Sequence, residues 1–119
     1  MKKLRLAVAT SEKDGLKDVV SNVFGRAKTF TIIDAEDDKI KDVTVVENPG
    51  LSYKHGAGPI VAKMLVDKNV DVVIAYVLGL GANELLKQHN IKHIAIKPNT
   101  KVETATREAL RILDKEGDT

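Results

Sequence analysis

Residues 70–97, VDVVIAYVLGLGANELLKQHNIKHIAIK, set the class of fold, because they predict a strand, a helix and a second strand in turn. The run VDVVIAYV is almost continuously apolar, which is typical of a strand buried on both faces of a sheet. GANELLKQHN predicts a short helix and IKHIAIK a short strand. Strands joined through a helix run parallel with right-handed crossovers, so this stretch predicts an α/β protein.

Helices are predicted on both sides of this stretch. Before it, a helix starts near Pro59 and carries apolar residues at helical spacing at Ile60, Val61, Met64 and Leu65. After it, Thr100 to Glu103 fits a capping box that opens a last helix. Gly117 lies where that helix is expected to stop.

The first half of the chain predicts three strands. In LRLAVAT (4–10), Arg5, Ala7 and Ala9 form a small-residue face suited to packing under a helix. KTFTIIDAE (28–36) and IKDVTVVEN (40–48) predict a hairpin. The acidic residues between them could be taken for a metal site, but a solvated turn is favoured because charge runs usually face water.

The strand directions follow from the connections. If the strand at 70–77 is parallel to 4–10, the helix before it begins at the carboxyl end of the sheet. The strand at 40–48 must end there too, which makes 28–36 antiparallel to the rest. We therefore predict one domain over residues 1–119, a three-layer α/β/α fold with a mixed five-stranded sheet.

Composition excludes several function classes. The net charge of +2 is too small to indicate nucleic acid or an anionic membrane, and 3% aromatic residues cannot build a base-stacking platform. The absence of cysteine removes disulfides, thiol nucleophiles and thiolate metal ligands. The apolar run near the N-terminus is too short for a signal peptide. A cytoplasmic protein is expected.

Loops at 10–27, 48–58, 77–83 and 97–101 should meet at the carboxyl edge of the sheet, where open α/β sheets bind ligands. NPGLSYKHGAGPI (48–60) leads into the helix that starts near Pro59, and a helix N-terminus favours an anion. Gly56 and Gly58 would let a ligand approach the backbone. Arg26 could pair with the anion, and His55 could bond to it.

Two further motifs carry weaker signals. GLGANE (79–84) resembles a glycine-rich phosphate loop, but it lacks the third glycine of the dinucleotide fingerprint and the Lys-Ser/Thr of a P-loop. Gly79 and Gly81 could still add backbone N–H groups at the same edge of the sheet. His89 and His93 have metal-ligand spacing but fall on different elements, so they are interpreted as two surface histidines.

Three motifs together, VSNVFGRAKTF (20–30), NPG…HGAGP (48–59) and DVVIAYVLGLGANELLKQHNIK (71–92), resemble the nitrogenase accessory factor family. This NifX-like family is the dinitrogenase iron–molybdenum cofactor biosynthesis domain. The resemblance runs from Leu4 to about Leu113. It implies a ribonuclease-H-like fold with a mixed five-stranded sheet.

The resemblance also implies a ligand, since members bind or carry iron–molybdenum cofactor, its precursors or other molybdenum–sulfur clusters. The family pattern usually has a histidine directly before FGRA, where the resemblance implies a cluster ligand, and Val23 stands there in this chain. His55 is then the best remaining metal ligand in the loops. The predicted cofactor-binding residues are Phe24, Gly25, Arg26, Tyr53, His55, Gly56, Gly58, Gly79 and Gly81.

Three functions stay open. The first is a non-enzymatic carrier of an anionic metal–sulfur cluster or oxyanion, with a cofactor-assembly protein as a candidate partner. The second is a small enzyme or binding module for a phosphorylated metabolite or nucleotide, against which the lack of an evident general base argues. The third is an interaction module without a small ligand. The sequence leaves the oligomeric state open.

Overall fold

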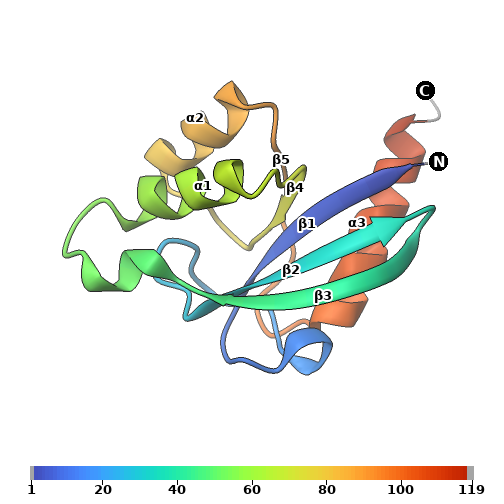
Figure 1. Ribbon diagram of the computed structural model, residues 1–119, viewed down its shortest axis with the longest axis horizontal. Coiled ribbons are helices and arrows are strands. Elements are labelled where there is room, and N and C mark those ends of the chain that lie inside the picture. Colours follow the sequence, from blue (N-terminus) through green and yellow to red (C-terminus); the bar gives the residue numbers. More distant parts are fainter. Residues whose placement is uncertain (1, 118–119) are drawn as a thin grey trace.

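The computed structural model describes residues 2–117, which form a five-stranded sheet in the order β3-β2-β1-β4-β5 (Figure 1). The strands are β1 (Lys3–Thr10), β2 (Thr29–Glu36), β3 (Lys39–Glu47), β4 (Val72–Ile74) and β5 (Lys92–Ile94). The helices are α1 (Ala57–Asp67), α2 (Leu80–Gln88) and α3 (Val102–Gly117), with short 3-10 turns η1 (Gly15–Lys17) and η2 (Pro49–Ser52).

The strand directions confirm the predicted topology. β1 pairs in parallel with β4, and β4 with β5. β2 is antiparallel to both β1 and β3, so β3 runs parallel to β1 and β2 alone is reversed. Two isolated antiparallel bridges, Thr10–Val20 and Val19–Lys101, hold loops outside the strands.

The acidic run between β2 and β3 is the hairpin turn that the sequence predicts. Asp37 and Asp38 have φ angles of 52° and 70°. Two consecutive positive φ angles are the requirement of a type I′ turn, whose twist matches a hairpin. Asp is among the residues that tolerate this conformation.

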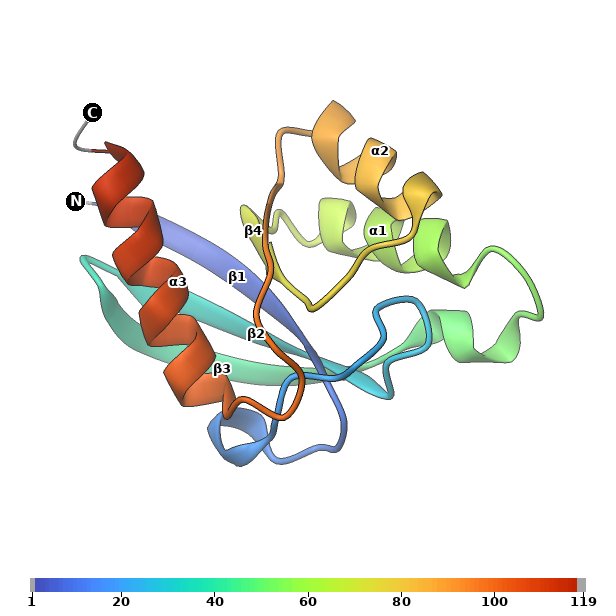
Figure 2. The same ribbon diagram turned by 180° about the vertical axis from the view of Figure 1, so that it is seen from behind.

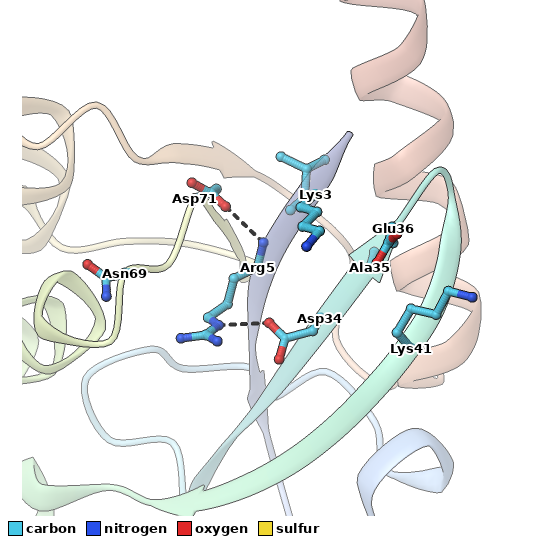
Figure 3. A pocket seen from close by; sticks show the side chains of 9 residues that line it. Lys3, Arg5, Asp34, Ala35, Glu36, Lys41, Asn69 and Asp71 are labelled. Carbon is cyan, nitrogen blue, oxygen red and sulfur yellow. Dashed lines mark hydrogen bonds and ion pairs between the residues drawn. The ribbon is translucent and has the colours of Figure 1, made fainter. Parts of the chain in front are cut away.

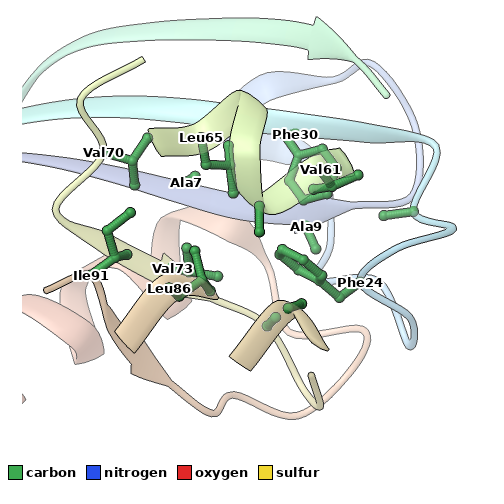
Figure 4. Close-up of a cluster of buried hydrophobic side chains, with 14 of the residues drawn as sticks. Ala7, Ala9, Phe24, Phe30, Val61, Leu65, Val70, Val73, Leu86 and Ile91 are labelled. Atoms are coloured by element: carbon green, nitrogen blue, oxygen red, sulfur yellow. The ribbon is translucent and has the colours of Figure 1, made fainter. Parts of the chain in front are cut away.

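Helices cover both faces of the sheet, α1 and α2 on one side and α3 on the other (Figure 2), so the three-layer prediction is confirmed. On the α1 side, the small side chains of Ala7 and Ala9 lie under the helix, as predicted, beside Val61 and Leu65 (Figure 4). Phe24 packs edge-on against Phe30 in this cluster, with ring centroids 5.5 Å apart.

The capping box predicted at Thr100 is wrong. The Ala105 N–H donates to the Lys101 carbonyl at 2.9 Å, which makes Lys101 the residue that flanks the helix and places Thr100 outside it. The Val102 N–H donates instead to the carbonyl of Asp18 at 2.9 Å. A distant loop therefore supplies the partner for the start of α3.

That loop, residues 11–28, is ordered by a buried carboxylate. Asp18 is only 2% exposed. Its oxygens accept from the backbone N–H groups of Glu12 at 3.0 Å and Val19 at 2.7 Å. The loop also contains the η1 turn. Across residues 2–117, no helix is both long and apolar enough to cross a membrane.

Candidate anion-binding site

The FGRA loop and the first turn of α1 lie in direct contact. A Cβ atom on Gly25 would stand 2.9 Å from the backbone nitrogen of Gly58 and 3.1 Å from its Cα. No side chain fits at that distance from backbone, so only glycine lets the loop lie against the helix start. Two motifs that are 30 residues apart in the sequence thus form one structure.

Asn48 stabilises this contact through hydrogen bonds. It was not among the predicted site residues. Its side-chain amide donates to the carbonyls of Gly25 at 2.9 Å and Ala27 at 2.7 Å. Its Oδ1 accepts from the Gly50 N–H at 2.6 Å. An Asn before Pro is a recognised turn former, which is the signal that could have singled it out.

Arg26 faces the loop at 48–56. Its guanidinium donates to the Lys54 carbonyl at 2.9 Å and, more weakly, to the Leu51 carbonyl at 3.4 Å. A guanidinium has five N–H donors, so further donors remain for a ligand. Arg26 therefore positions the loop through its backbone and keeps a positive charge beside it.

The start of α2 closes the other side of the same helix turn. A Cβ on Gly81 would lie 3.2 Å from Cγ of Pro59, and one on Gly58 would lie 3.5 Å from Cβ of Ala82. The FGRA loop, the start of α1 and the start of α2 therefore meet at one place. We call this junction the cradle, consisting of residues 24–26, 56–59 and 79–82.

Gly56 and Gly79 differ from the packed glycines. Gly56 caps α1 with a φ of 76°, a conformation that favours glycine. Gly79 caps α2 with a φ of −70°, which any residue adopts, and a Cβ there would meet nothing within 4 Å. The fold explains the glycine at position 56 but not the one at position 79.

The predicted side chains divide into exposed and buried groups. Tyr53, His55 and Val23 are exposed, so they are open to a ligand or partner. Phe24 is 3% exposed and packs in the core, where it shapes the loop but offers a ligand little surface. Within residues 2–117, no three His, Cys, Asp or Glu side chains come together as a metal site.

The fourth predicted loop, 97–101, lies against a different neighbour. Its backbone pairs with residues 19 and 20, through Val20 N–H to the Thr100 carbonyl at 2.8 Å and Asn99 N–H to the Val20 carbonyl at 2.9 Å. This contact belongs to the start of α3. His93, interpreted as a surface residue, is instead half-buried, with Nε2 2.8 Å from the Ala75 carbonyl oxygen, whereas His89 is exposed.

A cavity of about 440 Å³ lies at the opposite edge of the sheet (Figure 3). Its lining contains three cationic side chains and three acidic ones, which are Lys3, Arg5 and Lys41, and Asp34, Glu36 and Asp71. Arg5 Nε donates to Asp34 at 2.7 Å, and the Arg5 backbone N–H donates to Asp71 at 2.8 Å. The hydrogen bond that Asp34 accepts from Arg5, together with the negative charge of Asp34, raises the pKa of Arg5. This edge is therefore internally neutralised, unlike the cradle.

Comparisons with known proteins agree with the fold. Residues 4–111 match the family model described as dinitrogenase iron–molybdenum cofactor. The apo form of the orange protein from Desulfovibrio gigas is 30% identical, with a TM-score of 0.78 over 93% of this chain and 88% of that one. A Thermotoga protein described as a candidate NifB is 35% identical, with a TM-score of 0.74 over 91% and 88%.

A curated relative, an uncharacterised protein of Methanocaldococcus jannaschii, is 31% identical over 68 residues. That match spans 57% of this chain and 58% of the relative. The family model, in contrast, covers nearly all of the residues that form the sheet, the helices and the cradle. The chain belongs to the dinitrogenase iron–molybdenum cofactor family.

Proposed function

We propose that this protein binds and carries an anionic metal–sulfur cluster of the iron–molybdenum cofactor type at the cradle. The observation that carries the proposal is the packing of the FGRA loop and the start of α2 onto the first turn of α1. The first backbone N–H groups of a helix lack partners within the helix and carry its positive dipole end. The family match supplies the class of anion.

The charges around the cradle also favour a negatively charged ligand. Residues 21–27, 48–56 and 75–81 contain Arg26, Lys54 and His55 but no aspartate or glutamate. An anion placed there meets two permanent positive charges and no negative one from these segments. Arg26 is already held by backbone carbonyls, so its charge is fixed in place before a ligand arrives.

The cluster would be held mainly by charge and hydrogen bonds. The chain has no cysteine, and Val23 cannot coordinate a metal. His55 is the single histidine in the three segments and is exposed, so it is the candidate metal ligand. A cluster that makes so few bonds between its metal and the protein can leave the protein intact, as a carrier requires.

The alternative is a phosphorylated metabolite or nucleotide at the same helix start, because phosphate uses the same N–H groups. The three segments contain one histidine and no carboxylate, so they lack the histidine–carboxylate pair that many enzymes use as acid and base. Binding of phosphate alone, without thiometallate binding, would favour a phosphate-binding module.

The test is an anaerobic amide NMR titration with tetrathiomolybdate, molybdate and inorganic phosphate in separate samples. We expect tetrathiomolybdate to shift amides within 24–28, 53–60 and 78–83, while the hairpin turn at 36–39 stays unchanged as an internal control. Shifts confined to other residues would place the anion elsewhere and leave the glycines with a purely structural role.

A further inference from the structure

The exposed large hydrophobic side chains of residues 2–117 all lie on the segments that border the cradle. They are between 40% and 77% exposed, and they do not occur on the rest of this described surface. The six are Val23, Leu51, Tyr53, Tyr76, Val77 and Leu80. We call them the apolar rim.

The rim residues all lie on the three chain segments that form or border the cradle. Val23 precedes the FGRA motif, and Leu51 offers its carbonyl to Arg26. Leu80 adjoins Gly81, which packs on Pro59 at the start of α1. Exposed apolar side chains that gather on one part of a surface mark places that another molecule covers.

The charges of these segments indicate when a second copy of the chain can cover the rim. Without an anion, two copies would bring Arg26 and Lys54 of each against those of the other, and like charges oppose contact. An anion seated in the cradle reverses this, because both copies are then attracted to the same negative charge. An acidic partner protein would instead be repelled once the anion is bound, because both are negatively charged.

From these observations, and resting on the proposed function, we infer that the anionic cargo joins two copies of this protein, rim against rim. The bound anion lies on the two-fold axis between two cradles, and the apolar rims exclude water around it. A two-fold arrangement uses the same surface on both copies, so one rim is sufficient to build it. The empty protein stays monomeric.

The experiment is sedimentation velocity with and without tetrathiomolybdate, on samples whose amide spectra are recorded in parallel. With tetrathiomolybdate we expect a species of twice the 13.0 kDa of one chain, carrying one molybdenum per two chains. Without it we expect the single chain. A Leu80→Ser, Val77→Ser double variant should weaken this association about tenfold or more, because each interface loses four apolar side chains.

The outcomes separate this inference from the proposed function. The control is Lys87→Ser, an exposed change at the far end of the same helix, which should dimerise like the wild type. If tetrathiomolybdate shifts amides 53–60 while the protein stays monomeric, the inferred dimer is overturned, whereas anion binding at the cradle is supported. A dimer that forms without the anion, or that persists in the double variant, also overturns it. If no amide shifts, the proposed function fails first.

Discussion

At the scale of single residues, the glycines of the cradle have different physical causes. Gly25 is required by close packing against backbone, Gly81 is favoured by its tight contact with Pro59, and Gly56 is favoured by its positive φ. Gly79 is required by neither, since its backbone is ordinary and its surroundings are open. It is therefore the glycine whose replacement reports on a ligand and not on the fold.

We expect Gly79→Ala to lower the free energy of unfolding by no more than about 1 kcal/mol, because Gly79 is the N-cap of α2, where glycine is preferred to alanine. The added methyl group should nevertheless weaken tetrathiomolybdate binding, because it stands where an anion would approach the first N–H groups of α2. Denaturation and NMR titration of the same sample measure the two effects. Unchanged affinity would remove the start of α2 from the site.

Arg26 has two separable roles, a positive charge and a clamp on the loop at 48–56. Arg26→Ala removes both, and we expect it to weaken anion binding by about 1–3 kcal/mol, as loss of a charged hydrogen bond does. Arg26→Lys keeps the charge but lacks the planar fork that reaches two carbonyls. If the clamp matters, the lysine variant should bind almost as weakly as the alanine variant. Recovery of full affinity with lysine would assign the effect to charge alone.

Val23 stands where the family pattern has a histidine, and its side chain is exposed beside the FGRA loop. We expect Val23→His to strengthen the affinity for tetrathiomolybdate or an iron–molybdenum cluster, because it adds an imidazole ligand on a loop that borders the cradle. An anaerobic titration compares the two proteins, with Val23→Asn as the matched polar control. Equal affinities for histidine and asparagine would mean that this position does not coordinate the cluster.

At the scale of elements, the start of α3 shows where local sequence patterns mislead. Thr100 and Glu103 have the spacing of a capping box, yet the helix begins at Val102 and its first N–H is satisfied by Asp18. That partner is more than 80 residues away and depends on how the loop at 11–28 folds. A pattern of four neighbouring residues contains no information about it.

The corresponding prediction contrasts two substitutions. Thr100→Ala, which would cost about 1 kcal/mol at a true N-cap, should change the free energy of unfolding by less than about 0.5 kcal/mol. Asp18→Asn should cost about 2 kcal/mol, because it removes the charge from a buried group that accepts several backbone N–H bonds. Urea denaturation of both variants measures the difference. A larger loss of unfolding free energy for Thr100→Ala would mean that Thr100 does cap α3.

Strand direction was easier to predict than the site, for a physical reason. A strand–helix–strand alternation fixes direction through chain connectivity, so the reversed β2 followed from the sequence alone. The cradle instead depends on distances between backbones, such as Gly25 against Gly58, and on Asn48, which bridges two loops. Residue types indicated which loops meet, but not which side chains hold them together.

At the scale of the whole molecule, the two edges of the sheet differ in their charge balance. Near the cradle, cations and apolar side chains are gathered without carboxylates, whereas the opposite edge pairs Arg5 with Asp34 and Asp71. A net charge of +2 conceals this asymmetry. The distribution of charge, and not its total, supports the proposed place of the anion.

The opposite end of the molecule also holds a pair of carboxyl groups that makes stability depend on pH. Asp38, in the β2–β3 turn, shares a side-chain hydrogen bond with Asp114 of α3, and this bond, with the charge of Asp114, raises the pKa of Asp38. The folded state therefore binds this proton more tightly than the unfolded state. Stability from this pair rises as the pH falls through the raised pKa towards the ordinary value of 3.8, and is absent at neutral pH.

We expect Asp38→Asn to raise the thermal denaturation midpoint at pH 7, because it removes the repulsion between two carboxylates that join the sheet to α3. Asparagine also tolerates the positive φ of this position, and that benefit is the same at every pH. The repulsion disappears once Asp38 is protonated, so the difference between variant and wild type should shrink as the pH falls through the raised pKa. Midpoints measured across this range, with Asp37→Asn as the control in the same turn, test the assignment. A difference that stays constant with pH would mean that the turn conformation, and not Asp114, accounts for the gain.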